Sequence, residues 1–222
     1  MSVSRAKDSE NSTSTAFLQL AGVADQFERY ENPHAGRIVA IADEIARVFQ
    51  MAREDRRSLE AAALMHDLGE VAMERDYISR AGSLTEDERV DLARHPVIGE
   101  QEAARAGANR ATQLLVRWHH EWWNGFGYPD ALRGEQIPLA ARILRVADAY
   151  AARTDSRPYR PALTEDEART ELTVMAGIEF DPRVVMVLLN LPPIEALRSF
   201  AQVPQPVEQK TGEDWNLFSS FR

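Results

Sequence analysis

The chain has 222 residues, a formal net charge of −9 and no cysteine. This length allows one large domain or two small ones, and it is sufficient to bury a sizeable core. Without cysteine there can be no disulfide, thiolate zinc site or cysteine nucleophile, so any metal must be bound by nitrogen and oxygen ligands. The negative charge argues against binding of a nucleic acid polymer, which usually needs a broad basic surface.

Both ends of the chain are expected to lie outside the folded domain. Residues 1–14 are rich in Ser, Asn and Thr and lack the apolar stretch of a signal peptide, so we expect a disordered segment on a cytoplasmic protein. No apolar run reaches the roughly 18 residues of a membrane-spanning helix. Residues 201–222 contain two prolines and end in aromatic residues. This tail could dock on the domain or on another subunit, as in a homodimer.

Residues 15–200 have the apolar spacing of amphipathic helices, in segments divided by glycine and proline. No alternating pattern typical of strands is present, so the sequence predicts a single all-α domain. The expected helices surround the apolar stripes at residues 16–23 and 38–48, and lie at about residues 54–68, 85–106, 109–121, 137–153, 164–176 and 182–189.

Glycine and proline set several expected boundaries. Gly69 should end the helix that begins near residue 54, because glycine readily adopts the left-handed conformation of a helix cap. Pro96 should bend or interrupt the helix that begins near Thr85, because proline has no backbone N–H. Between Asn124 and Pro129, two glycines and a proline predict a structured loop.

The chain contains five histidines, and two aspartates in apolar surroundings accompany them. Asp67 follows His66 directly, and Asp148 lies between two alanines. An unpaired carboxylate is costly in such surroundings, whereas imidazole and carboxylate together bind divalent metals. The candidate metal ligands are His34, His66, Asp67, His95, His119, His120 and Asp148.

The spacing of these residues suits two neighbouring ions. Successive helical residues point about 100° apart, so His66 and Asp67 can face two adjacent metal positions, and the two oxygens of Asp67 could bridge them. Taken singly, each residue has a simpler interpretation. His66 could be a core histidine bonded to a carbonyl, His34 an exposed residue and His95 the cap of a bend. Asp148 could pair with a nearby arginine, but the joint pattern favours a metal centre.

Longer motifs surround the candidate ligands. They are His34-x-x-Arg37, His66-Asp67-Leu68-Gly69, His95-Pro96-Val97-Ile98-Gly99, His119-His120-Glu121-x-x-Asn124-Gly125-x-Gly127-Tyr128-Pro129, Gly134-Glu135-x-Ile137-Pro138-Leu139, Ala147-Asp148, Arg157-Pro158-Tyr159-Arg160 and Phe180-Asp181-Pro182. In this order, over about residues 20–195, they resemble the HD-GYP domain, a subgroup of the HD phosphohydrolase superfamily. The long histidine-to-proline element is highly specific.

The resemblance implies an all-α HD-domain helical bundle with a binuclear metal site in its core. It also implies a phosphodiesterase that hydrolyses cyclic di-GMP to linear pGpG, and in some members to GMP. The two divalent ions are usually iron, and manganese is also effective in the family. By position, the ligands of the first metal would be His34, His66, Asp67 and Asp148. Those of the second would be Asp67, His95, His119 and His120.

The expected chemistry is metal-assisted hydrolysis. A hydroxide that bridges two cations is a nucleophile at neutral pH, and the cations can stabilise charge on the phosphodiester. The expected catalytic residues are His66, Asp67 and Asp148. The resemblance further implies that Gly127, Tyr128 and Pro129 shape the mouth of the pocket, and that Arg157 and Arg160 contact phosphate or guanine. These arginines could instead be solvated loop residues. Glu121 is expected to orient an imidazole.

Four residues depart from the family pattern. Glu70 replaces a common lysine, which could meet a substrate phosphate, with an anion that would repel it. Asn124 stands where an aspartate is usual, and it keeps a carbonyl acceptor that could still shape the loop. Ala151 has no polar atom where a second aspartate is frequent. Tyr30 takes the place of the carboxylate found in members with a third metal, so we expect two metals.

These departures leave several functions open. An active enzyme, with activity weakened by Glu70, Asn124 and Ala151, is favoured because every metal ligand is present. The alternative is a degenerate HD-GYP domain that binds metal or dinucleotide and signals through a protein partner without turnover. A third interpretation is an HD phosphohydrolase that acts on another phosphate ester or nucleotide.

Overall fold

The computed structural model describes residues 2–30, 32–80, 82–156 and 161–193, with side chains from residue 15 onward. All regular elements within these ranges are helical, apart from an isolated bridge between Ala176 and Phe180. The elements are α1 (Ser2–Phe27), α2 (His34–Val48), α3 (Arg53–Met65), α4 (Leu68–Met73), α5 (Glu86–Leu92), α6 (His95–Arg105), α7 (Arg110–Trp118), the 3-10 helix η1 (Gly134–Gln136), α8 (Leu139–Arg153), α9 (Glu165–Val174) and α10 (Pro182–Leu189). The predicted all-α fold is confirmed.

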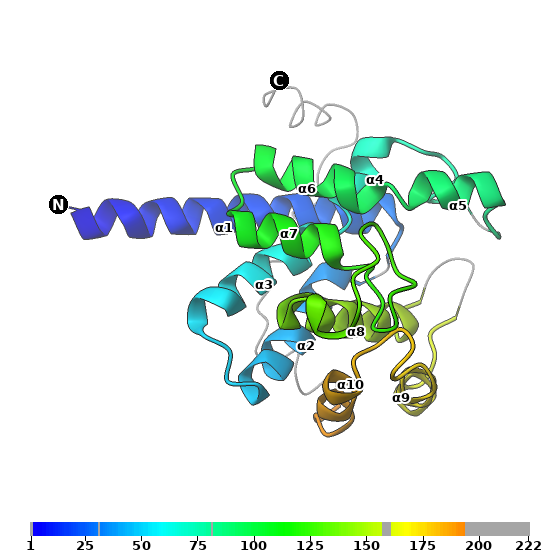
Figure 1. Cartoon of the computed structure of the whole chain (residues 1–222). Helices are drawn as coiled ribbons and strands as arrows, with labels where there is room; N and C mark the ends of the chain where they lie inside the picture. The colour runs from blue at the N-terminus through cyan, green and yellow to red at the C-terminus, as the bar shows by residue number, and fades with distance from the viewer. Residues whose placement is uncertain (1, 31, 81, 157–160, 194–222) are drawn as a thin grey trace.

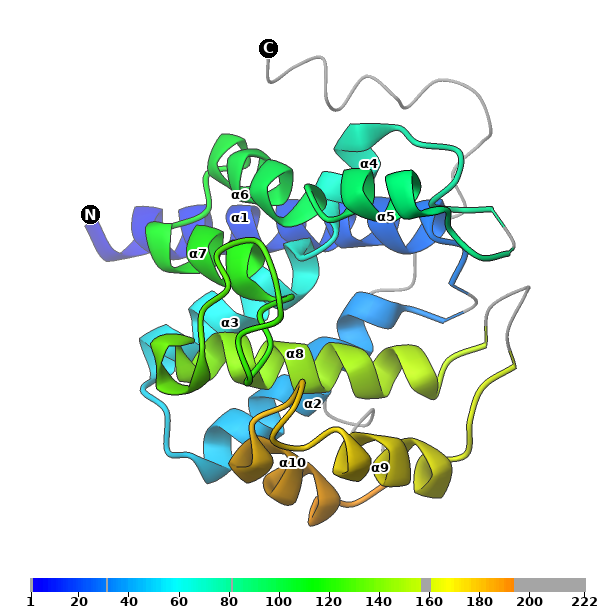
Figure 2. The ribbon, with the colours of Figure 1, turned by 45° about the vertical axis from the view of Figure 1, so that its right-hand side comes forward.

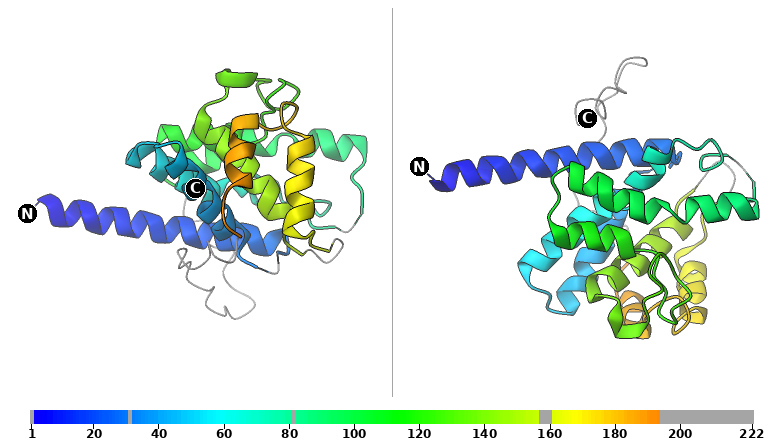
Figure 3. Two further views of the ribbon diagram at one scale, coloured as in Figure 1. Left: turned by 90° about the horizontal axis from the view of Figure 1, so that it is seen from below. Right: turned by 45° about the horizontal axis from the view of Figure 1, so that its top comes forward.

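The helices pack around α2, α3 and α8, which contact one another (Figures 1 and 2). Helices α9 and α10 cover α8 on one side of the molecule, while α4, α6 and α7 lie on the other side, where α4 contacts α1. The first half of α1 projects beyond the remaining helices (Figure 3). Within the described ranges, every helix is too short or too polar to cross a membrane.

The hydrophobic core determines which residues of α2, α3 and α8 point inward. On α2, Ile38, Ile41 and Ile45 are completely buried, and His34 lies one turn before Ile38 on the same face. Burial of each such aliphatic side chain contributes roughly 1.5–3 kcal/mol. The same apolar periodicity continues on α8, where Leu144 and Ala151 are buried on either side of Asp148. The core therefore directs His34 and Asp148 toward the interior.

The end of α3 differs from the prediction. The helix ends at Met65, and Asp67, with φ −102° and ψ 14°, separates it from α4. Gly69 lies inside α4 and is not a cap. A Cβ atom at Gly69 would lie only 2.0 Å from the carbonyl oxygen of His95, so glycine is required here because α4 packs closely on α6. Packing between distant segments, which local patterns do not show, places this glycine.

Two other expectations concern helix interruptions and the N-terminus. The predicted helix from Thr85 to Ala106 is interrupted, as expected from Pro96: α5 ends at Leu92, and α6 begins at His95 with the proline in its first turn. Helix α1, by contrast, begins at Ser2, within the segment predicted to be disordered. Extending a helix that is already anchored by a buried face, here at Phe17, costs little.

Candidate metal centre

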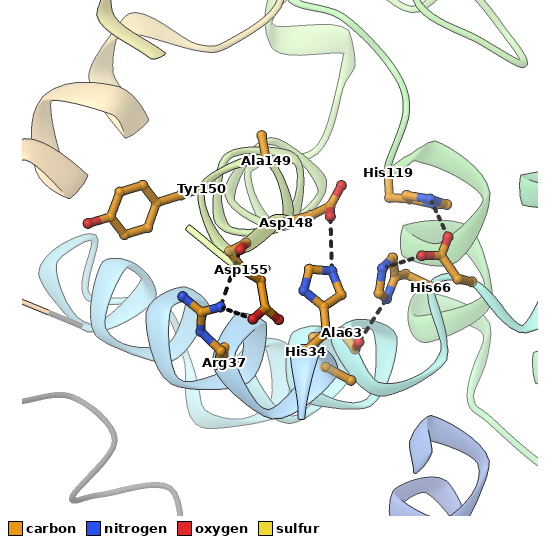
Figure 4. Close-up of polar contacts among 12 residues, drawn as sticks. His34, Arg37, Ala63, His66, His119, Asp148, Ala149, Tyr150 and Asp155 are labelled. Atoms are coloured by element: carbon orange, nitrogen blue, oxygen red, sulfur yellow. Dashed lines mark hydrogen bonds and ion pairs between the residues drawn. The ribbon is translucent and has the colours of Figure 1, made fainter. Parts of the chain in front are cut away.

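The seven candidate ligands lie together in two adjacent groups. His34, His66 and Asp148 form the first group, and Asp67, His95, His119 and His120 form the second. Within each group the ligand atoms lie within 4.8 Å of one another. Figure 4 shows His34, His66 and His119 next to one another, with Asp148 approaching His34 from α8. The structure thus brings together every residue predicted to bind a metal.

Asp67 lies between the two groups. Its Oδ2 atom is 2.7 Å from Nε2 of His66, while its Oδ1 atom is 3.5 Å from Nε2 of His95 and 3.6 Å from Nε2 of His119. The two carboxylate oxygens therefore face different groups. This geometry suits a carboxylate that binds one ion through each oxygen.

Three of the imidazoles are oriented by backbone carbonyls. In each ring, Nδ1 lies 2.6–3.0 Å from the carbonyl oxygen three residues earlier, as seen for His66, His95 and His119. A carbonyl can only accept, so Nδ1 holds the proton, and Nε2 of the neutral ring keeps a lone pair for a metal. The carbonyl bond of His66 was predicted as the simpler interpretation, and it is compatible with a ligand role.

Several nitrogen atoms of the site are poorly satisfied. Both ring nitrogens of His34 are buried without a hydrogen bond, and Nε2 of His66 is buried against the Asp67 carboxylate, 2.7 Å away. Nε2 of His95 and Nε2 of His119 lie 3.2 Å apart, so two lone pairs face each other when both Nδ1 atoms hold the protons. Buried polar atoms without partners are costly, and a cation between these nitrogens would satisfy them. The donor set therefore fits divalent metal ions.

His34 is held from two sides. Tyr30 stacks on its ring, with centroids 3.8 Å apart and planes inclined by 7°. Nε2 of His34 lies 3.5 Å from Oδ1 of Asp148. One turn further along α2, Arg37 donates to Thr154 Oγ1 at 2.7 Å and pairs with Asp155 at 3.3 Å (Figure 4). These contacts fix α2 against the end of α8, which brings His34 to Asp148.

The charges of the site favour ionised carboxylates. Burial opposes ionisation of Asp67, but the charge of His66 and the neighbouring His119 hold its pKa well below the usual value. For Asp148, burial is similarly outweighed, chiefly by His34, and the pKa is about 2. Burial lowers the pKa of His95 to about 4. For His66, burial acts in the same direction, but Asp67 raises its pKa to about 10, so a metal must displace a proton there.

The loop after His120 folds back onto the second ligand group. A Cβ atom at Gly127 would lie 2.2 Å from the Trp122 nitrogen and 2.5 Å from the His120 carbonyl oxygen, so only glycine fits. Tyr128 stacks on His120 with ring centroids 4.9 Å apart, and Pro129 follows through a cis peptide bond. Gly127, Tyr128 and Pro129 thus lie on a loop beside the second ligand group, and their role at the mouth of a pocket stays a prediction. The predicted contacts of Arg157 and Arg160 lie outside the described residues.

Two residues of this loop have structural roles. Glu121 accepts hydrogen bonds from the backbone nitrogens of Asp130 and Leu132, at 2.6 and 2.9 Å. It therefore holds the loop closed, and the expected bond to an imidazole is wrong. The side-chain oxygen of Asn124 accepts from the Phe126 nitrogen at 2.9 Å, as a loop-shaping residue should. The sequence could not show either partner, because the loop must first fold around Gly127.

Two charged residues border the centre. Glu70 is 9% exposed, and its Oε1 atom lies 3.9 Å from Nδ1 of His95, on the side of the ring turned away from the candidate ions. Arg145 donates to Oδ2 of Asp148 at 3.0 Å. In the sequence, pairing of Asp148 with an arginine is an alternative to metal binding, whereas in the structure Oδ2 pairs with Arg145 and Oδ1 still faces His34. Its position three residues earlier on the same helix was the available signal.

The fold and this centre define a helical domain with a buried cluster of histidine and aspartate side chains whose donor atoms suit divalent metal ions. The model of the HD domain family matches residues 19–184. The chain belongs to the HD domain family. The sequence motifs resemble those of the HD-GYP subgroup, and known phosphodiesterases are among the relatives of the chain.

Three known proteins illustrate the similarity. The cyclic di-GMP phosphodiesterase response regulator RpfG of Xanthomonas campestris is 42% identical over 69% of this chain and 41% of its own length. The 3′3′-cGAMP-specific phosphodiesterase 2 of Vibrio cholerae is 28% identical over 77% of this chain and 33% of its own length. The chain thus spans less than half the length of these curated relatives. The crystal structure of the V. cholerae cyclic GMP-AMP phosphodiesterase V-cGAP3 has the same fold, with a TM-score of 0.63 at 19% identity over 86% of this chain and 51% of that one.

Proposed function

We propose that this protein is a metal-dependent phosphodiesterase that hydrolyses cyclic di-GMP to linear pGpG, with GMP as a further product. The observation that carries this proposal is the pair of ligand groups that meet at Asp67. It is supported by the similarity to RpfG, whose name states this activity. Two ions are proposed, with iron first and manganese as its substitute, because nitrogen and oxygen donors suit both.

Bound divalent ions would supply water activation and stabilisation of the developing charge on the phosphodiester. The chain's own residues prepare the site for them. The carbonyl bonds at Nδ1 hold His66, His95 and His119 with Nε2 turned inward, so little reorganisation is needed on binding. Tyr128 covers His120 on the loop side and limits access of water to that ring. Asp67 and Asp148 stay ionised at neutral pH, as ligands must.

The setting of this activity is also proposed. A chain without cysteine suits the reducing cytoplasm, where we place the protein. The C-terminal tail, residues 201–222, lies outside the described residues, and a homodimer formed through it remains a prediction that a measurement of mass in solution tests.

Glu70 supports a second candidate function. Its carboxyl group lies beside His95, in place of a cation that could meet a substrate phosphate, so an anionic dinucleotide would lack that contact. A domain with intact metal ligands and weak turnover would act as a binding module that signals through a protein partner. A relative named for 3′3′-cGAMP makes that dinucleotide the second substrate to test.

The test is cleavage by purified protein that has been reconstituted anaerobically with ferrous iron or with manganese. Cyclic di-GMP and 3′3′-cGAMP are supplied separately, and the products are separated by chromatography. The proposal predicts pGpG from cyclic di-GMP at the higher rate. A fully loaded protein that forms no product would contradict it, and tight dinucleotide binding in the same sample would support the binding module.

A further inference from the structure

Asp148 is shared between the candidate metal site and a buried arginine. Its Oδ1 atom faces His34 at 3.5 Å, and its Oδ2 atom accepts a hydrogen bond from Nη1 of Arg145 at 3.0 Å. The Arg145 side chain is only 14% exposed. One oxygen is therefore fixed by the arginine, while the other is presented to the ligand group of His34 and His66.

The arginine is itself held by a carboxylate from another part of the chain. Glu179, in the loop between α9 and α10, accepts a hydrogen bond from Nη2 of Arg145, and its side chain is 7% exposed. Nε of Arg145 is buried without a hydrogen-bond partner. The guanidinium is thus oriented by the hydrogen bonds that it donates to Asp148 and Glu179. The charge of Glu179 also helps to compensate this buried cation.

The loop that contains Glu179 also holds the chain segment after His119 and His120. The Trp123 nitrogen donates to the Glu179 carbonyl oxygen at 3.0 Å, and the Asn124 nitrogen donates to the Ile178 carbonyl oxygen at 2.9 Å. Through its side chain, Glu179 therefore bonds to Arg145, which contacts Asp148 of the first ligand group. Through its backbone, it bonds to Trp123, which follows the histidines of the second group.

We propose that Arg145, held by Glu179, is a positioning residue that fixes the Asp148 carboxylate for metal binding. This role rests on the proposed metal centre. Without the arginine, the carboxylate can rotate about its side-chain bonds and must be ordered when the ion binds. Loss of a partner that orients a metal ligand typically weakens metal binding by about 10- to 100-fold.

Arg142 offers a matched control. It lies one turn earlier on the same helix and donates to Asp181 of the same loop at 2.6 Å. Its other hydrogen bond, from Nε at 2.8 Å, reaches the Ile137 carbonyl oxygen. Replacing either arginine breaks one ion pair between α8 and the loop, but only Arg145 has a hydrogen bond with Asp148.

The experiment measures Mn²⁺ binding to the metal-free full chain by calorimetry and the Tm of each metal-free variant. The variants are Arg142→Met, Arg145→Met and the double variant Arg145→Met/Glu179→Met, in which Glu179 is not left as an unpaired buried charge. We expect one Mn²⁺ to bind about 10- to 100-fold more weakly in both Arg145 variants, and wild-type affinity in Arg142→Met.

Two results would overturn this role. In one, the double variant binds both ions with wild-type affinity, which would mean that Arg145 only neutralises Glu179. In the other, Arg142→Met weakens binding as much as Arg145→Met, which would mean a general loosening of the loop. No substrate is present, so a protein that binds two ions and cleaves nothing would refute the proposed catalysis without affecting this test.

Discussion

Nε2 of His66 lies 2.7 Å from Oδ2 of Asp67, although these consecutive residues belong to different ligand groups. The arrangement arises because α3 ends at Met65 and the chain leaves helical geometry at Asp67. The carboxylate can then reach back to His66 while its other oxygen faces His95 and His119. The end of a helix, and not the regular turn within one, places the two residues toward adjacent ions.

Replacing Asp67 with alanine should remove both metals, because each ligand group loses the oxygen that faces it. The loss of affinity should exceed the roughly 10- to 100-fold effect typical of an outer partner. Metal content after dialysis measures the effect, and the Tm of the metal-free variant shows whether the fold persists. Retention of two metal equivalents would show that Asp67 is not a bridging ligand.

Replacing Gly69 with alanine should destabilise the fold, because the new Cβ atom would lie 2.0 Å from the His95 carbonyl oxygen. Overpacking of this kind costs about 1–3 kcal/mol, and here the clash is with backbone. Gly22 in α1 is the matched control, since a Cβ atom there meets nothing within 4 Å. Alanine at residue 22 should be neutral or stabilising by up to about 1 kcal/mol. Urea unfolding measures both, and equal effects would contradict the proposed close packing.

The stability of the metal-free protein should depend on pH through Glu70. Burial, followed by the charge of Asp67, raises the pKa of Glu70 well above its ordinary value of 4.5. The folded state therefore binds a proton that the unfolded chain releases. The stability from this proton is complete below about pH 4.5 and is lost as pH rises toward the folded pKa.

Glu70→Gln removes this pH dependence, because glutamine does not titrate. Relative to wild type, the variant should gain stability as pH increases from 4.5 toward 8, as measured by Tm in buffers without metal. Glu74→Gln, at an exposed site, controls for the loss of one negative charge. A difference between wild type and Glu70→Gln that is constant over this range would rule out the raised pKa.

Glu70→Lys should strengthen binding of cyclic di-GMP, because a cation would replace an acidic group beside the second ligand group. A charge-assisted hydrogen bond of about 1.5 kcal/mol corresponds to roughly tenfold tighter binding. The Kd should decrease from wild type to Glu70→Lys, with metal content checked in both proteins. Equal Kd values would show that the departure at this residue does not limit substrate binding.

The sequence was sufficient to predict that the seven candidate side chains lie together, because the buried helical stripes that contain Ile38 and Leu144 also contain His34 and Asp148. Local patterns likewise predicted the break before Pro96. They could not show the role of Gly69, because the atom that excludes a side chain there is the carbonyl oxygen of His95, on a different helix. The prediction that Glu121 orients an imidazole was wrong for a similar reason. Its partners, the backbone nitrogens of Asp130 and Leu132, approach it only after the loop has folded. Arg145 depends on Glu179, which is distant in sequence.

The most direct test of the two-ion centre is a titration of metal-free protein with Mn²⁺ in the presence of cyclic di-GMP. Bound metal and released pGpG are measured at each step. We predict two binding equivalents, with cleavage that rises as the second equivalent binds. Binding of two equivalents without release of pGpG, or full cleavage with one equivalent bound, would contradict a phosphodiesterase in which Asp67 joins two metal ions.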